Sequence, residues 1–228
     1  MRTTWTHLEL LLHTKHYTEA IKYITNAIGA CNFNLNTENK DGRRNSQNDQ
    51  NIVTEALMKA FPGVIREECP EGRELGDIYI LDKPWNIKVV NEADGQSNNM
   101  AGIVALTKYI FSAEKCNKRD HLPMILLNTP QDQVLQKYGL IIVGKQTGKC
   151  WVGYLDQIPT HNIRVNPSNS LQVSWPENHV ERTNGEYRKL IESKIVELME
   201  KWAEPFKVFE REKERANEQR VGTILHDQ

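Results

Sequence analysis

The sequence predicts one α/β domain. The chain has 228 residues, which is enough for one domain with a substantial core and too short for two ordinary domains joined by a linker. Segments with apolar residues at helical spacing occur together with short apolar runs of the kind that form strands. Hydrophobic residues make up 39% of the chain and charged residues 26%, which is typical of a globular protein. We therefore expect residues 1–228 to form a single domain.

The first part of this domain is expected to contain helices and a loop. Residues 1–30 carry apolar side chains at helical spacing with a break near His16, which predicts a pair of helices that supply packing or dimer surface. Residues 31–50 are rich in Asn, Asp, Gly, Arg and Ser, so we expect an exposed polar loop. Residues 51–61 predict an amphipathic helix that ends at Pro62-Gly63. Its expected inward side chains are Ile52, Val53, Ala56, Leu57 and Ala60.

The most informative stretch predicts two paired strands. Residues 76–81 and 85–90 are apolar runs separated by the turn Asp82-Lys83-Pro84, and Val64-Ile65-Arg66 is expected to start the sheet before them. We expect a short turn to bring Leu81 near Asn86. This stretch belongs to a central segment, residues 51–155, that we expect to hold the functional site.

Several polar side chains of these two strands are expected to share one face. Asn86 and Lys88 lie two residues apart, so they point the same way while Ile87 points into apolar packing. The expected register puts Asp77 and Tyr79 on that same face, with Asp77 a diagonal neighbour of Lys88. A carboxylate, an amide oxygen and an ammonium group would then converge. Hydrolysis of a phosphodiester with a divalent metal needs this set of groups.

A Gly-Asp on one strand and an acid-x-Lys on the next form the signature of the PD-(D/E)xK nucleases, which include most type II restriction endonucleases. The chain resembles this family over residues 48–111, and more loosely in its C-terminal helix. Asn86 stands where the family usually has Asp or Glu, and Leu75-Gly76 replaces a frequent Pro. The order of elements resembles that of the blunt-cutting HincII and EcoRV group. Asn and Gln in the loops favour an A·T-rich site, as in enzymes of the SwaI type.

The resemblance implies a central mixed sheet flanked by helices, with a long C-terminal helix. It implies a type II endonuclease that needs Mg²⁺ and no nucleotide cofactor, and that acts as a homodimer on both strands of a palindromic double-stranded DNA site. Asn86 leaves open a second hypothesis, a catalytically decayed DNA-binding module of the same fold. A repair or junction nuclease that recognises DNA shape is a third.

The resemblance also assigns roles to individual residues. Asp77, Asn86 and the Ile87 carbonyl would hold the Mg²⁺. Lys88 would position or deprotonate the attacking water, or stabilise charge on the pentavalent phosphate. Glu55 on the upstream helix would act through a water, or is only a surface charge.

DNA contacts are expected from the polar loop that follows the second strand and from basic residues in the first loop. Asn and Gln make bidentate contacts to adenine in the major groove, although Asn98 or Asn99 could instead cap the next helix. Arg43 and Arg44 are candidate phosphate contacts, although surface Arg residues are usually solvated. The recognition candidates are Gln96, Ser97, Asn98 and Asn99.

The rest of the chain predicts further elements of both kinds. A helix is expected over residues 100–112, a buried strand over 123–127, and a hairpin of 140–143 with 150–155. Residues 156–186 are rich in Pro and Asn and are expected to be irregular. Residues 187–220 predict a C-terminal helix that is interrupted near Pro205.

Other features limit the function classes. Residues 139–145 imitate the start of a P-loop but lack the Ser or Thr that must follow the Lys. The four cysteines form no CxxC pair, and His7, His13 and His16 lack a further ligand, so a zinc site is not expected. No apolar run approaches the roughly 18 residues of a membrane span, and we expect a soluble protein of the bacterial cytoplasm. The net charge of −1 requires any DNA-binding cations to be concentrated in a cleft.

Overall fold

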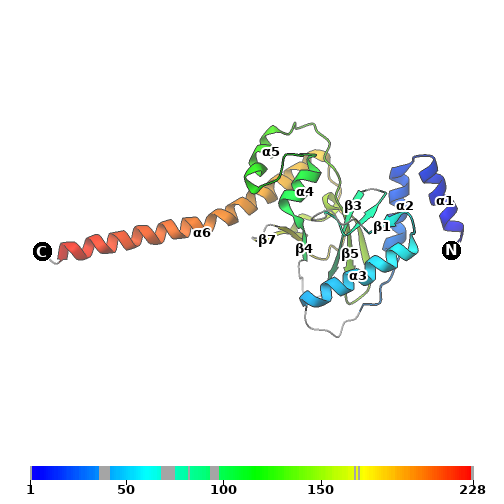
Figure 1. Ribbon diagram of the computed structural model, residues 1–228, viewed down its shortest axis with the longest axis horizontal. Coiled ribbons are helices and arrows are strands. Elements are labelled where there is room, and N and C mark those ends of the chain that lie inside the picture. Colours follow the sequence, from blue (N-terminus) through cyan, green and yellow to red (C-terminus); the bar gives the residue numbers. More distant parts are fainter. Residues whose placement is uncertain are drawn as a thin grey trace.

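The computed structural model has an α/β architecture built on a mixed five-stranded sheet and a smaller three-stranded sheet (Figure 1). Helices flank the larger sheet, and a long C-terminal helix leaves the body of the protein. The structure describes residues 2–35, 42–67, 75–81, 83–92, 98–166, 168 and 170–226. Of these, the side chains of residues 2–6, 42–47, 98, 205–206, 208–210 and 212–226 lie outside the description.

The larger sheet has the strand order β1-β2-β3-β5-β6. Pairing is antiparallel everywhere except between β3 and β5, which run parallel. The predicted hairpin of residues 140–155 is confirmed, and β5 is buried along its whole length, which explains its unbroken apolar run. The strands are β1 Ile65–Arg66, β2 Ile78–Ile80, β3 Lys83–Val90, β5 Gly139–Gly144 and β6 Cys150–Tyr154.

The smaller sheet has the strand order β4-β8-β7, with antiparallel pairing throughout. Its strands are β4 Asn98–Gly102, β7 Ile163–Asn166 and β8 Ser170–Val173. The helix predicted over residues 100–112 is therefore wrong at its start, because α4 spans only Ile103–Ile110. The irregular segment predicted over 156–186 is also wrong, because it contains β7, β8, the short 3-10 helix η3 Thr160–Asn162 and the end of another, η2 Leu155–Gln157.

The N-terminal helices cover one face of the larger sheet. The predicted pair is confirmed as α1 Arg2–His13 and α2 Tyr17–Gly29, with the break at the predicted place. Helix α3 spans Gly42–Ala60, so the exposed loop predicted for residues 31–50 is wrong over its second half.

Helix α3 buries a different stripe from the one predicted. Val53 and Leu57 are buried as expected, whereas Ile52 is 38% exposed and Ala56 also faces solvent. The buried polar residue Asp49 lies one turn before Val53, and its carboxylate pairs with Lys145 Nζ at 2.9 Å. The inward stripe therefore follows the spacing i, i+4, i+5, i+8 from Asp49, because Thr54 is also buried.

The run predicted as a strand at residues 123–127 is a helix. Helix α5 spans Leu122–Asn128 and follows the 3-10 helix η1, Arg119–His121. Pro123 lies in its first turn, where a missing N–H costs no hydrogen bond. Met124 and Leu127 are 56% and 79% exposed, which a buried strand would not allow.

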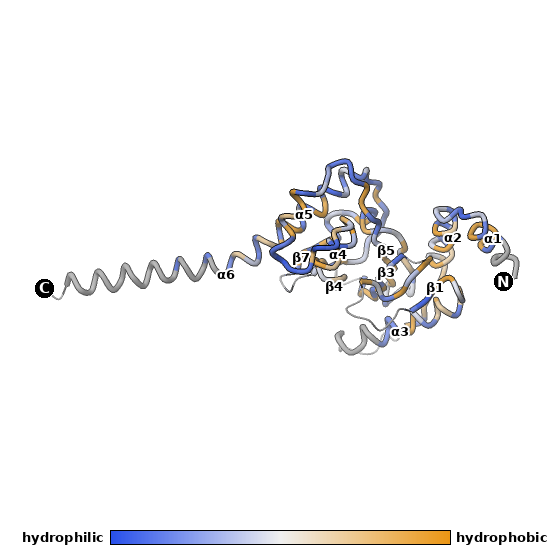
Figure 2. Tube along the Cα trace, turned by 45° about the horizontal axis from the view of Figure 1, so that its top comes forward, coloured by the Kyte–Doolittle hydropathy of each residue, from blue (hydrophilic) through white to orange (hydrophobic). Residues whose placement is uncertain are grey.

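Two hydrophobic cores lie on opposite faces of the larger sheet. Alternate residues of β3 and β5, among them Ile87 and Ile141, pack with α2 and α3. The intervening residues, among them Leu140 and Ile142, pack with α4, α6 and the smaller sheet. Figure 2 shows the hydrophobic segments gathered on the strands and on the helices around them. Full burial of one such aliphatic side chain contributes about 1.5–3 kcal/mol, so both faces are strongly fixed.

The C-terminal helix α6 spans Asn184–His226 and continues through Pro205, so the predicted interruption is wrong. Its 43 residues extend for about 65 Å at a rise of about 1.5 Å per residue. The buried Arg188 joins its first turns to the end of α5 by donating to Pro130 O at 2.5 Å and to Thr129 O at 2.8 Å. Among the helices described, none is long and apolar enough to cross a membrane.

Candidate active site

The hairpin β2–β3 places the predicted polar residues on one face, although with a different register. Ile78 pairs with Trp85 and Ile80 with Lys83, so the connection is two residues long. The expected pairing of Leu81 near Asn86 is wrong by four residues. An even shift keeps every side chain on its face, so Asp77 stays on the side of Asn86 and Lys88.

Asp77 lies where β2 begins and binds the neighbouring strand through its backbone and its side chain. Its N–H donates to Trp85 O at 2.8 Å. Its Oδ2 accepts a hydrogen bond from Ile87 N at 2.6 Å and lies 3.4 Å from Lys88 Nζ. Oδ1 accepts no hydrogen bond from the described residues, so it is available to a cation.

Lys88 is held in a partly dry environment beside this carboxylate. Its side chain is 14% exposed, and that of Asp77 is 23% exposed. Burial lowers the pKa of Lys88 below its ordinary value, and this effect outweighs the charge and hydrogen bond of Asp77, which raise it. A lysine with a lowered pKa gives up its proton more readily, so Lys88 is better suited to accept a proton than a solvated lysine.

Asn86 lies beside this pair and is 6% exposed. Its side chain makes a hydrogen bond with the hydroxyl of Tyr138, which places the amide nitrogen toward that ring. Its Oδ1 is buried and accepts no hydrogen bond within the described part of the chain. A buried oxygen acceptor without a partner is costly, so it marks a position where an absent group could bind.

Tyr138 supports the site from the position directly before β5, the strand that pairs with β3, and sequence reasoning missed it. Its hydroxyl donates to Leu75 O at 2.5 Å, two residues before Asp77. Burial, then the charges of Asp77, Tyr79 and Tyr109, raise the pKa of Tyr138 well above its ordinary value, so it remains a neutral donor. No motif marks this residue in the sequence, where the available signal is its place directly before a buried strand.

A cavity of about 500 Å³ lies next to these residues. It adjoins the site because Tyr138 binds Leu75, and because the Tyr109 ring meets the Tyr138 ring edge-on at 6.2 Å between centroids. Lys108, on the α4 wall of this cavity, is exposed. The cavity is lined by Leu75, Ala105, Lys108, Tyr109, Ser112, Glu114 and Gln136.

The structure does not bring Glu55 to this site. Glu55 is exposed on α3, whose buried Val53 and Leu57 pack with Ile87 on the opposite face of the sheet. The sheet therefore separates its carboxylate from Asp77.

The predicted DNA contacts are only partly within the described residues. Gln96 and Ser97 lie outside them, as do the side chains of Asn98, Arg43 and Arg44, whose backbones belong to β4 and α3. Asn99 is described and exposed on β4.

The capping alternative for Asn98 and Asn99 is wrong. Helix α4 has Gly102 as its N-cap and no side-chain hydrogen bond there. A capping role therefore does not account for the two amides.

No three His, Cys, Asp or Glu side chains gather in a metal-binding group among the described residues. The cation ligands that the site offers are therefore one carboxylate, an amide oxygen and backbone oxygens.

No protein-family model matches the chain, and a search of the curated proteins gives no significant match.

Proposed function

We propose that this protein is a Mg²⁺-dependent endonuclease with the PD-(D/E)xK fold that hydrolyses double-stranded DNA as a type II restriction endonuclease. The observation that carries the proposal is the convergence of three groups on one sheet face. Asp77 lies 3.4 Å from Lys88, and the buried Asn86 Oδ1 beside them has no partner in the described chain. Phosphodiester hydrolysis uses oxygen ligands for a metal together with a nearby cation.

The available oxygens fit a magnesium ion. Mg²⁺ prefers hard oxygen ligands and is usually held by one or two carboxylates with several waters. Asp77 Oδ1, Asn86 Oδ1 and the Ile87 carbonyl would hold it, and the unpartnered Asn86 oxygen supports this set. When bound, the ion would polarise water and neutralise charge on the phosphate. Asn86 adds no negative charge, so we expect weaker metal binding than in an acid-x-Lys enzyme.

The protein's own residues would orient the reaction. The Ile87 N–H donates to Asp77 Oδ2 at 2.6 Å and holds the carboxylate in place. Asp77 Oδ1 would therefore keep one direction toward the metal. Lys88 would hydrogen-bond the attacking water and accept its proton, which its lowered pKa favours. Lys108 at the neighbouring cavity would contact a phosphate of the same strand.

Cleavage of both strands would require two copies of this site. The described part of one chain contains one such site, and a palindromic duplex has two-fold symmetry. A homodimer with the same symmetry would present one site to each strand.

A DNA-binding module without hydrolytic activity is the second candidate, and the neutral Asn86 favours it. A repair or junction nuclease would share the site and differ by cutting according to DNA shape.

The test is digestion of a large DNA of known sequence by the purified full-length protein in Mg²⁺. Discrete fragments that disappear with EDTA and with Lys88→Ala would support the proposal, and a loss of at least 100-fold in rate is expected for this variant. Lys59→Ala is the matched control, because Lys59 is exposed on α3, which covers the other face of the sheet. Asn86→Asp should lower the Mg²⁺ concentration needed for half-maximal rate.

Each remaining outcome selects another function. DNA binding without cleavage in Mg²⁺ or Mn²⁺, by the wild type and by Asn86→Asp, would identify the binding module. Cleavage that depends on branched DNA and ignores sequence would identify the junction nuclease.

A further inference from the structure

The smaller sheet presents one apolar face and one polar face. Ile163 and Val165 of β7, and Leu171 and Val173 of β8, are at most 5% exposed and belong to the core beneath α6. The intervening side chains therefore point away from the protein. This outward set consists of Asn99, Arg164, Asn166 and Gln172, and we refer to it as the amide face.

Three residues of the amide face form a row across the sheet. Asn99 pairs with Gln172, and Gln172 pairs with Arg164, so the row crosses β4, β8 and β7 in register. The three strands contain no Asp or Glu, and Arg164 is their only charged residue. The charge of this face therefore suits a polyanion.

Hydrogen bonds within the face fix the direction of its amides. Asn99 Oδ1 accepts from Asn166 Nδ2 at 2.8 Å and from Gln172 Nε2 at 2.9 Å. Both lone pairs of this oxygen are thereby used. Gln172 keeps its Oε1 and its second N–H unbonded within the described chain, which leaves one acceptor and one donor side by side.

We propose that the β7–β8 hairpin enters the major groove of duplex DNA, where Gln172 contacts an adenine and Arg164 a guanine. The inference rests on the proposed function and adds residues that determine its sequence specificity. Adenine presents N6–H and N7 in the major groove, which match the unbonded acceptor and donor of a glutamine, and Arg binds guanine O6 and N7. Asn99 and Asn166 are positioning residues that hold Gln172.

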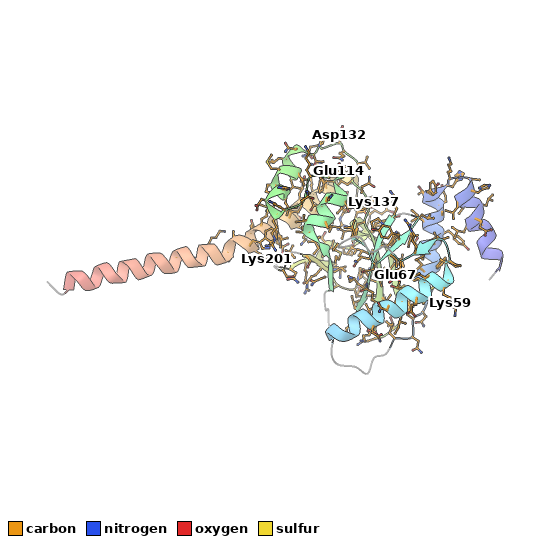
Figure 3. The ribbon with its side chains drawn as sticks, viewed as in Figure 1. Lys59, Glu67, Glu114, Asp132, Lys137 and Lys201 are labelled. Carbon is orange, nitrogen blue, oxygen red and sulfur yellow. The ribbon has the colours of Figure 1, made fainter. Side chains whose placement is uncertain are left out.

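The dimensions of the hairpin fit this role. Two strands lie about 4.8 Å apart, and the major groove is about 12 Å wide and admits a two-stranded ribbon. The two base-reading residues, Arg164 and Gln172, are paired on neighbouring strands, so their Cα atoms are about 4.5–5.5 Å apart and their side chains can reach neighbouring base pairs. Lys201 of α6 donates to Val165 O at 3.0 Å and ties β7 to the helix where it leaves the body (Figure 3).

The position of this sheet in the chain agrees with the role. Strand β4 lies against β3, which carries Lys88, and it begins at the end of the polar loop that follows β3. A duplex held at Asp77 and Lys88 would therefore pass close to the sheet that contains Gln172.

The test is selection of bound duplexes from a random pool by full-length Lys88→Ala protein in Ca²⁺, followed by affinity measurements on the selected site and on random DNA. Gln172→Ala and Arg164→Ala should each weaken binding to the selected site about 5- to 150-fold and leave binding to random DNA within about 2-fold. Gln172→Glu should shift the preference at one position from adenine to cytosine, because a carboxylate only accepts hydrogen bonds. Gln131→Ala, an exposed glutamine after α5, is the matched control, and thermal unfolding checks that each variant folds.

The outcomes separate this inference from the proposed function. If the parent protein binds a specific sequence, and both Gln172→Glu and Arg164→Ala keep the same base preference, the inference is overturned and the endonuclease proposal stands. Binding and cleavage without any sequence preference would overturn the inference together with the type II specificity, and would leave only a non-specific metal-dependent nuclease. A parent protein that neither binds nor cuts DNA would overturn both.

Discussion

Removal of the Tyr138 hydroxyl tests how the site is supported. In Tyr138→Phe the Leu75 carbonyl loses a donor at 2.5 Å and the Asn86 amide loses its acceptor. A typical hydrogen bond contributes about 1 kcal/mol, and a buried partner left unsatisfied raises the cost to about 1–3 kcal/mol. We expect a loss of about 2–3 kcal/mol in the free energy of unfolding. In a chain of this size each kcal/mol lowers the melting temperature by roughly 2–4 °C, so the decrease should be about 4–12 °C.

Urea unfolding followed by circular dichroism would measure this loss, with Tyr109→Phe as the matched control. The Tyr109 hydroxyl makes one longer hydrogen bond, to Lys137 O at 3.2 Å, so its removal should cost less than about 1 kcal/mol. A double-mutant cycle of Tyr138→Phe with Asn86→Ala should show a coupling of about 1 kcal/mol, because the two side chains share a hydrogen bond. Equal losses for the two Tyr variants, or strictly additive effects in the cycle, would refute the assigned role of Tyr138.

Three further predictions concern packing, thiol reactivity and pH. Gly139→Ala should destabilise the protein by about 3 kcal/mol in urea unfolding, because the added Cβ would overlap the Trp85 ring. A second substitution of Trp85 by a smaller residue that restores part of this stability would support that reason. Burial is the main cause that raises the pKa of Cys150 to about 12, and the nearby Cys31 adds to it. Iodoacetamide at pH 8, followed by mass spectrometry, should therefore label Cys150 at least about 100-fold more slowly in the native than in the unfolded chain. Burial raises the pKa of Glu92, but the hydrogen bonds from Thr147 and Gln146 lower it by more than burial raises it. The resulting pKa is below the ordinary value. The carboxylate therefore stabilises the fold above about pH 4.5. The loss expected for Glu92→Gln at pH 7 is below about 1 kcal/mol, because solvent screens this partly exposed group, and the loss should shrink as the pH falls below about 4.5. A loss that is constant with pH would contradict this reasoning.

The sequence predicted those elements whose apolar pattern has one clear period. The β5–β6 hairpin and the α1–α2 pair were correct because each combines a strong pattern with a clear turn. The run at residues 123–127 failed because a short apolar segment fits a strand or a helix, and Pro123 in the first turn favours the helix. The loop at 31–50 failed because its helical half is polar, and α3 buries Asp49 through an ion pair with Lys145.

The predicted site was correct in its faces and wrong in its register. Alternation alone decides which side chains share a face, so Asp77, Asn86 and Lys88 could be grouped from the sequence. The turn could not be predicted, because Leu81 adopts a left-handed conformation with φ of 49°, which is rare for a branched apolar residue. Tyr138 could not be found at all, because it reaches the site only through the parallel pairing of β3 with β5.

That parallel pairing separates the assembly of the site into two stages of folding. Asp77 and Lys88 lie in one hairpin, so their approach needs closure of only a short loop, an event of microseconds. Tyr138 is 50 or more residues further along the chain and cannot reach Asn86 until the crossover from β3 to β5 has closed. Contacts between residues so far apart in sequence form slowly, because the chain loses the entropy of the intervening loop before the contacts can stabilise it. We therefore expect Asp77 and Lys88 to meet early in folding, and Tyr138, which holds Asn86, to arrive only when β5 joins the sheet.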